Sequence, residues 1–211
     1  MDASVVYQGQ FGPFTLDKED YQEVILYRAG LGLAALCFLA GAGLTLTLDP
    51  SPVLTQILTV LYWSFLGGLG LSLWMIHIYL RPLHRLLQVF WLVGVMVSLA
   101  LSLKVGPFSL LAFSYSHPWT LWGLGFSFAA LTGIFFKEAF CFNRLETKFL
   151  TPLVPSLLLG HLAGLWTPGV EKGLLALWAA LFAIFALRKA LQAIPPDIGD
   201  KSVFIHLKDK A

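Results

Sequence analysis

The chain has 211 residues, of which 57% are hydrophobic and only 12% are charged. Soluble domains carry about 25% charged residues, so this composition excludes an ordinary water-soluble protein. The formal net charge of +2 gives no reason to expect nucleic-acid binding. Apolar runs long enough to cross a hydrocarbon core about 30 Å thick recur along the chain, and they predict a polytopic membrane protein in contact with the lipid bilayer.

The first part of the chain, residues 1–24, is acidic and lacks the basic or Arg-rich character of a cleaved leader, so we expect a retained cytoplasmic segment. Apolar segments then follow, and because lipid offers no partner for backbone N–H and C=O groups, each predicts a helix. The predicted fold class is all-α, a polytopic transmembrane helix bundle of about six spans within residues 25–190, followed by a polar cytoplasmic tail at 191–211. The six predicted spans are residues 26–48, 53–80, 86–103, 118–136, 149–167 and 173–190.

The basic residues indicate the orientation of this bundle. With a cytoplasmic N-terminus, twelve of the 14 lysines and arginines fall on the cytoplasmic side, and only Lys104 and Lys172 fall outside. This agrees with the positive-inside rule and predicts an N-in, C-in topology. Residues 105–119 are apolar but too short to span, so we expect an interfacial or re-entrant piece on the outer side, with Tyr115 and Trp119 at headgroup level.

The fifth predicted span contains Pro152 and Pro155, which remove two backbone donors close together. A regular helix is therefore expected to begin near Pro155, leaving residues 149–154 non-helical at membrane depth. On that interpretation His161 lies deep in the bundle. Such a broken helix is typical of a substrate or proton path, which keeps a small transporter among the alternatives.

The stretch FFKEAFCFNRLETKF, residues 135–149, carries charged side chains between two apolar segments. Carboxylate and imidazole groups suit iron, manganese or zinc, and a thiolate favours zinc or iron. One interpretation is a metal site; the other is that the two glutamates pair with nearby arginines or lysines while the cysteine packs as a small hydrophobe. The predicted metal ligands are Glu138, Cys141, Glu146 and His161.

Two further interpretations concern cofactors and partners. Haem held between His77 and His161 is a weaker alternative to a metal ion, because no helical spacing supports it. Small residues at helical spacing predict close helix packing within the chain, or a homodimer. They are Gly125, Ala129 and Gly133 in one span and Gly160 and Gly164 in the next. The residues predicted to contact a partner or lipid headgroups are Arg81, Arg85, Lys137, Arg144 and Lys148.

Several stretches together carry a resemblance to a known family. They are VYQGQFGPFTL and QEVILYRAGL near the start, FKEAFCF with Glu146, and the later GHLAG. With these stretches the chain resembles an integral membrane family known mainly from cyanobacteria and plastids, called domain of unknown function 2301, over nearly its whole length. The resemblance implies a small polytopic protein of oxygenic phototrophs, in a thylakoid or plasma membrane, with no assigned activity.

The sequence contains no GxxxxGK[ST], GxSxG or HExxH pattern, so no catalytic residue is predicted and an enzyme is disfavoured. The leading hypothesis is a non-enzymatic accessory or assembly factor of a bioenergetic, photosynthetic membrane, which binds a membrane-protein complex. A metal- or haem-binding redox protein and a small transporter are the alternatives.

Overall fold

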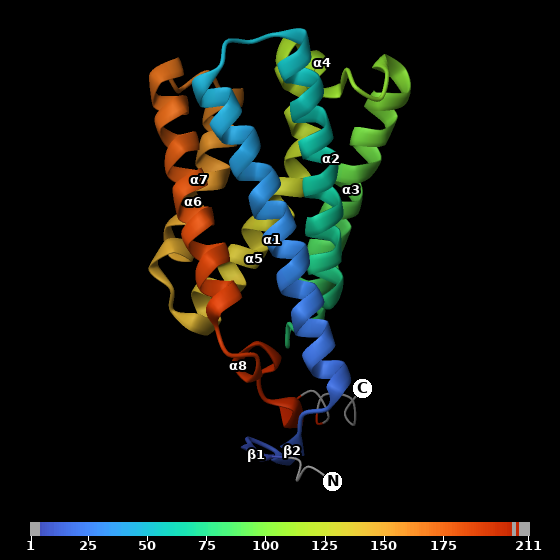
Figure 1. The fold of residues 1–211 in the computed structure, drawn as a ribbon, viewed down its shortest axis with the longest axis vertical. Coiled ribbons are helices and arrows are strands. Elements are labelled where there is room, and N and C mark those ends of the chain that lie inside the picture. Colours follow the sequence, from blue (N-terminus) through green and yellow to red (C-terminus); the bar gives the residue numbers. More distant parts are fainter. Residues whose placement is uncertain (1–4, 204–205, 207–211) are drawn as a thin grey trace.

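A bundle of six long helices forms the body of the protein (Figure 1). The computed structural model describes residues 5–203 and 206. Within these residues five helices are long and apolar enough to cross a membrane, and the shorter α6 packs between α5 and α7. The all-α membrane bundle of about six spans is therefore confirmed. The helices are α1 (Lys18–Thr47), α2 (Pro52–Met75), α3 (Arg81–Val105), α5 (Leu121–Phe142), α6 (Leu145–Leu162) and α7 (Pro168–Leu191).

The N-terminal hairpin and α8 (Pro195–Ile198), near the C-terminus, lie at the same end of the bundle, which we call the terminal end (Figure 1). A two-stranded antiparallel hairpin, β1 (Val6–Gly9) and β2 (Gly12–Thr15), precedes α1 there. Asp17 then caps α1. Its side chain accepts a hydrogen bond from the backbone N–H of Asp20 at 3.0 Å, and the Asp20 side chain accepts one from the backbone N–H of Asp17. The sequence did not predict the hairpin. If the positive-inside prediction holds, the terminal end is the cytoplasmic one.

The opposite end of the bundle is closed by a short helix, α4 (Leu110–Ser116), and a 3₁₀ turn, η1 (Pro118–Thr120), between α3 and α5 (Figure 1). Tyr115 and Trp119 are exposed on this piece. A helix of seven residues cannot span a bilayer, so it lies at the end of the bundle, as expected for an interfacial segment.

The predicted break in the fifth span is wrong. α6 is continuous from Leu145 to Leu162, with Pro152 and Pro155 inside it. Helices in membranes tolerate proline where neighbouring helices and Ser or Thr side chains compensate for the lost donors. Here neighbouring helices lie on both sides, because α6 is packed between α5 and α7. The structural basis for a broken-helix transport path is therefore absent from α6.

Glycines allow the closest helix contact, between α1 and α2. A Cβ atom on Gly30 would lie 2.6 Å from the carbonyl oxygen of Gly68, and one on Gly68 would lie 2.7 Å from that of Gly30. Both distances are too short for carbon, so the two backbones approach only because neither residue has a side chain. The small residues at helical spacing that the sequence pointed to have other surroundings. Gly133 packs on Leu87 and Gly160 on Trp166, whereas Gly125 and Ala129 line an open apolar groove between α5 and α6. A homodimer remains a prediction.

We predict that Gly30→Ala will lower the stability of the bundle. The added methyl group must push α1 away from α2, and overpacking of this kind costs about 1–3 kcal/mol. Gly32→Ala is the matched control, because a Cβ there meets nothing within 4 Å. Thermal unfolding in detergent should show a lower midpoint for Gly30→Ala and an unchanged or higher one for Gly32→Ala. Equal midpoints would contradict the close α1–α2 contact.

Candidate functional site

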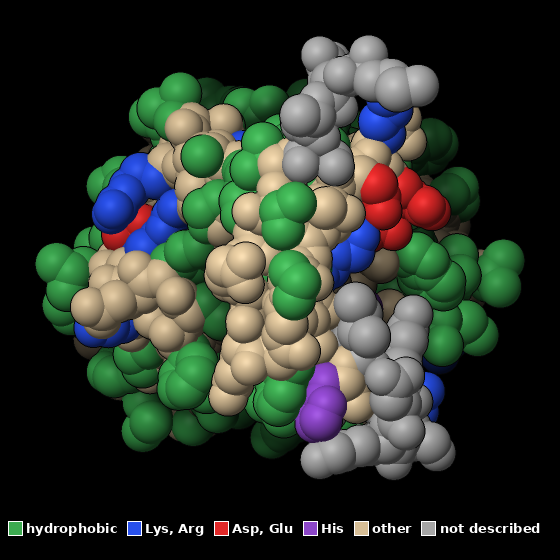
Figure 2. Space-filling model, turned by 90° about the horizontal axis from the view of Figure 1, so that it is seen from below, with side chains coloured by type: hydrophobic (Ala, Val, Ile, Leu, Met, Phe, Trp, Pro, Cys, Tyr) green, Lys and Arg blue, Asp and Glu red, His purple; other side chains and the backbone are tan. Residues whose placement is uncertain are grey.

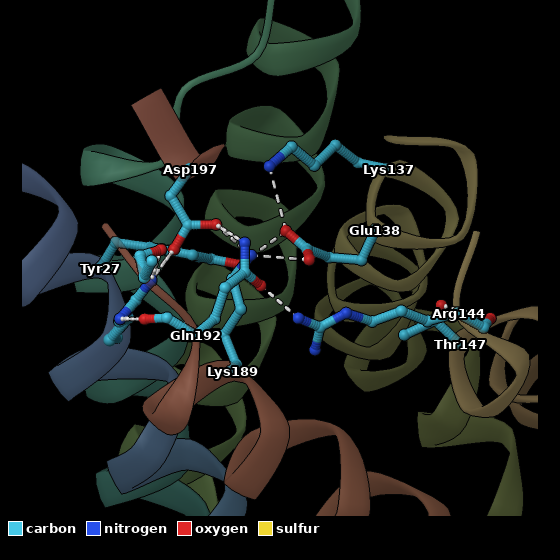
Figure 3. Close-up of polar contacts among 10 residues, drawn as sticks. Tyr27, Lys137, Glu138, Arg144, Thr147, Lys189, Gln192 and Asp197 are labelled. Atoms are coloured by element: carbon cyan, nitrogen blue, oxygen red, sulfur yellow. Dashed lines mark hydrogen bonds and ion pairs between the residues drawn. The ribbon is translucent and has the colours of Figure 1, made fainter. Parts of the chain in front are cut away.

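Ionisable side chains are buried together where α5 and α7 end, at the terminal end of the bundle (Figure 3). Glu138 is fully buried near the end of α5, and Lys189 is 1% exposed in the last turn of α7. Asp197 is buried on α8 (Pro195–Ile198), which follows α7 after a short turn. Side chains from four helices and the turn after α7 meet here, and we call them the buried ion-pair network: Tyr27, Arg28, Lys137, Glu138, Lys189, Gln192 and Asp197.

Lys189 lies at the centre of this network. Its Nζ is 2.7 Å from Glu138 Oε2 and 2.5 Å from Asp197 Oδ1, so the ammonium group bridges two carboxylates. The same nitrogen lies 4.3 Å from the centre of the Phe142 ring and 5.4 Å from that of Tyr27. Two carboxylates and two ring faces thus replace the water that a lysine would otherwise need.

Asp197 attaches the C-terminal segment to the first helix. Its Oδ2 accepts bonds from Arg28 Nε at 2.8 Å and Nη2 at 2.6 Å, a two-pronged contact suited to guanidinium and carboxylate. Arg28 also donates to the backbone carbonyls of Gln192 and Ala193. These carbonyls follow α7, where backbone acceptors are left without a helical partner, so Arg28 closes that helix end as well as holding α8.

The second carboxylate oxygen of Glu138 also accepts hydrogen bonds. This Oε1 atom accepts them from Lys137 Nζ at 3.0 Å and from the Tyr27 hydroxyl at 3.2 Å. Arg144, which begins α6, donates to the side-chain oxygen of Gln192 (Figure 3). The turn between α5 and α6 fits this arrangement locally, because Asn143 adopts the left-handed conformation, with φ 52°, that ends many helices.

The four predicted metal ligands lie in separate surroundings. Glu138 belongs to the network, Glu146 pairs with Arg188 at 2.8 Å, and Cys141 is exposed. His161 is not deep in the bundle; it is exposed near the opposite end of α6 and pairs with Glu171 at 2.7 Å. At 1.5 Å per residue, His161 is about 22 Å along α6 from Glu146. Among the described residues no three His, Cys, Asp or Glu side chains group as metal ligands, and the site remains a prediction from sequence.

The haem alternative requires two histidines near one iron. His77 follows α2 at the terminal end and lies 3.0 Å from Glu23, whereas His161 lies near the far end of α6. Opposite ends of one bundle cannot supply both axial ligands of a single haem, so this arrangement does not place a haem between them.

The five predicted contact residues divide into two groups. Lys137 and Arg144 are buried, because both point into the network. Arg81, Arg85 and Lys148 are exposed and remain available at the terminal end. Figure 2 views this end and shows charged side chains gathered among a surround of hydrophobic ones.

Of the seven network residues, the sequence singles out only Lys137 and Glu138. Lys189 falls in the last predicted span and Asp197 in the predicted polar tail, and neither was expected to form a buried ion pair. The sequence did contain a signal for Lys189. It lies in the last turn of an apolar helix and follows buried Phe182 and Phe185 at helical spacing, so all three lie on one face. No local pattern marks Asp197, because its partners are Arg28 and Lys189 on other helices.

A second set of contacts holds the tail against the N-terminal hairpin. Asp200 accepts the backbone N–H of Gln10 at 2.6 Å and both the N–H and the hydroxyl of Ser202. The Ser202 hydroxyl in turn accepts the N–H of Phe11 at 3.0 Å. Lys201 bridges Asp17 and Asp20 at the start of α1. The hydrogen bond from the Ser202 side chain and then that from the Gln10 backbone hold the pKa of Asp200 below its usual range.

Comparisons with known proteins agree with a membrane protein. The family model described as "Uncharacterized integral membrane protein (DUF2301)" matches residues 71–206. An "Uncharacterized protein" from Haemophilus influenzae is 28% identical over 193 residues, covering 90% of this chain and 94% of the relative. No solved structure matches. The Haemophilus relative does not support restriction to cyanobacteria and plastids, or a thylakoid location; a multi-pass protein, consistent with a bacterial plasma membrane, is supported.

Glu138→Gln tests the burial of the network. Removing this charge leaves the buried ammonium groups of Lys189 and Lys137 without one of their carboxylate partners, which costs about 3–5 kcal/mol. The sequence interpretation, in which Glu138 forms an exposed pair, predicts about 0–1 kcal/mol. Thermal unfolding in detergent separates the two, with exposed Glu19→Gln as the control. The double variant Glu138→Gln/Lys189→Met should be more stable than Glu138→Gln alone, because it also removes the Lys189 ammonium group that lost its Glu138 partner.

The contact between tail and hairpin should depend on pH. Because the folded pKa of Asp200 is depressed, its contribution is present above the ordinary value of 3.8 and is lost as pH falls through the lower folded value. Hydrogen-exchange protection of the Gln10 amide, corrected for intrinsic exchange, should therefore fall on acidification below about pH 4. Asp200→Asn should show low protection at every pH. Protection that is unchanged in acid would contradict the role of this carboxylate.

Proposed function

The chain belongs to the uncharacterized integral membrane protein family DUF2301, and from this premise we propose that it is a non-enzymatic accessory or assembly factor of a bioenergetic bacterial membrane. On this proposal, a membrane-protein partner binds the turn between α5 and α6 at the terminal end. The photosynthetic setting expected from the sequence is not part of the proposal, given the Haemophilus relative.

One observation carries the proposal: in this turn most charged side chains are buried, while large apolar side chains are exposed. Four of its five charged residues are buried: Lys137, Glu138, Arg144 and Glu146. Its large apolar residues point outward instead, at 83% exposed for Phe140, 66% for Leu145 and 62% for Phe149. We call these three side chains, together with exposed Lys148, the docking turn.

The network gives the docking turn a fixed shape. Glu138 and Arg144 are held from inside by Lys189 and Gln192, and Leu145 and Phe149 lie one turn apart on the same face of α6. A preformed apolar surface loses little conformational entropy on binding, which favours association with another membrane protein. Lys148 favours a partner with an acidic residue at the edge of the contact.

Replacing the apolar side chains of the docking turn should release the partner without unfolding the bundle. The test variant is Phe140→Ser/Leu145→Ser/Phe149→Ser, extracted from its native membrane in mild detergent and run on a native gel. The control variant carries serine at three exposed apolar positions near the opposite end, Leu48, Leu103 and Phe108.

We expect wild type and control to migrate as a complex larger than the protein alone, and the docking-turn variant to migrate as the protein alone with an unchanged unfolding temperature. Mass spectrometry of the larger band identifies its components, and a second, differently tagged copy reports a homodimer. A docking-turn variant that keeps the complex, or wild type that migrates alone, would overturn the proposal.

A further inference from the structure

A pocket separate from the docking turn opens at the terminal end, where α2 ends and α3 begins. Its volume is about 500 Å³. The walls come from the second turn of α1, the end of α2, the connection that follows and the first two turns of α3. The polar and aromatic side chains that line it are Glu23, Trp74, His77, Arg81, His84 and Arg85.

Two arginines give this pocket its charge. Arg81 and Arg85 are one helical turn apart, so both project from the same face of α3. Both are exposed, and within the part of the chain that the structure describes neither forms an ion pair. Arg28 and Arg188, by contrast, each have a carboxylate partner. Glu23 is the only carboxylate among the described residues that line the pocket, and it lies 3.0 Å from His77. The two guanidinium groups therefore exceed the negative charge around them.

The helix backbone favours an anion as well. Leu80 precedes α3 and provides no side-chain cap, and the first turn has no acidic residue, so the positive end of this helix is uncompensated. His84 Nε2 lies 2.6 Å from the carbonyl oxygen of Leu73, which can only accept, so Nε2 carries a proton there. That proton is used within the protein, so Arg81 and Arg85 are the cationic groups of the pocket that remain free to bind an anion.

The pocket also lies at the right level for a lipid headgroup. Trp74 is 69% exposed at its edge, immediately before α2 ends, and the apolar part of α3 begins after Arg85. Tryptophan and arginine gather where the hydrocarbon core meets the headgroups. The apolar faces beside the pocket can contact acyl chains while the arginines reach the phosphate.

We propose that this pocket binds the phosphate of an anionic phospholipid from the leaflet at the terminal end, with Arg81 and Arg85 as its principal ligands. Guanidinium groups match phosphate oxygens in pairs, and basic pockets at the cytoplasmic ends of membrane helices recognise such headgroups. The positive-inside prediction puts the pocket in the leaflet where anionic lipids attract basic residues. The site lies on α1, α2 and α3, so it does not depend on the docking turn.

The test measures phosphatidylglycerol that stays bound to the full chain, by native mass spectrometry after purification in detergent with equal phosphatidylglycerol and phosphatidylcholine. The variant is Arg81→Gln/Arg85→Gln. The control is Lys104→Gln/Lys172→Gln, which removes the same charge from exposed positions near the other end. Arg81→Lys/Arg85→Lys keeps the charge but loses the paired geometry of guanidinium. Thermal unfolding without added lipid checks that all variants fold.

We expect wild type and control to retain phosphatidylglycerol over phosphatidylcholine. Each lost arginine should weaken retention about fivefold, so the loss of both in the glutamine variant should weaken it about 25-fold, with the lysine variant in between. Three outcomes would overturn the proposal: equal retention by wild type and the glutamine variant, equal loss in the control, or displacement of the lipid by millimolar inorganic phosphate. The last would assign the pocket to a soluble phosphate.

Discussion

The position of the Lys189 ammonium between two carboxylates is the constraint on which the terminal end of this protein depends. Lys189 is on α7, Glu138 on α5 and Asp197 on α8, so one nitrogen fixes three elements, and Arg28 adds α1 through the same aspartate. A charge buried here is tolerated only while its partners remain in place, because the cost of burying an unpaired ion exceeds that of most packing defects. The C-terminal segment is therefore part of the bundle and not an appendage to it.

This internal pairing explains why the terminal end presents an unusual surface. Four of the five charged residues in 135–149 are buried, and only Lys148 is exposed. Phe140, Leu145 and Phe149 are therefore left to face lipid or a partner. Arg81 and Arg85 lie outside the network and keep their charge available. The same physical rule produces both features, since carboxylates and cations that satisfy one another in the interior no longer determine what the surface contacts.

The two surfaces lie on different helices, and we propose different contacts for them. The docking turn joins α5 and α6, whereas the arginine pocket is formed by α1, α2 and α3. A lipid held at the pocket and a protein held at the turn would both approach from the terminal side. The close approach of α1 and α2 at Gly30 and Gly68 holds together the two helices that form part of the pocket wall, and the network joins α5 to α7 beside the turn. A bundle of a few helices can thus present defined contacts with little mass outside the membrane.

The sequence by itself determined the bundle, its approximate spans and the membrane setting, because each apolar run must satisfy its own backbone hydrogen bonds in lipid whatever its neighbours are. It also marked residues 135–149 as special, but left their carboxylates between metal ligation and pairing with cations. It could not choose the partners. Glu138 meets Lys189 and not an arginine of the next turn, and His161 meets Glu171 at the far end. Nor could it show that α6 continues through Pro152 and Pro155, since that depends on support from α5 and α7. These outcomes arise from contacts between residues far apart in the chain, which only the packing of the helices decides.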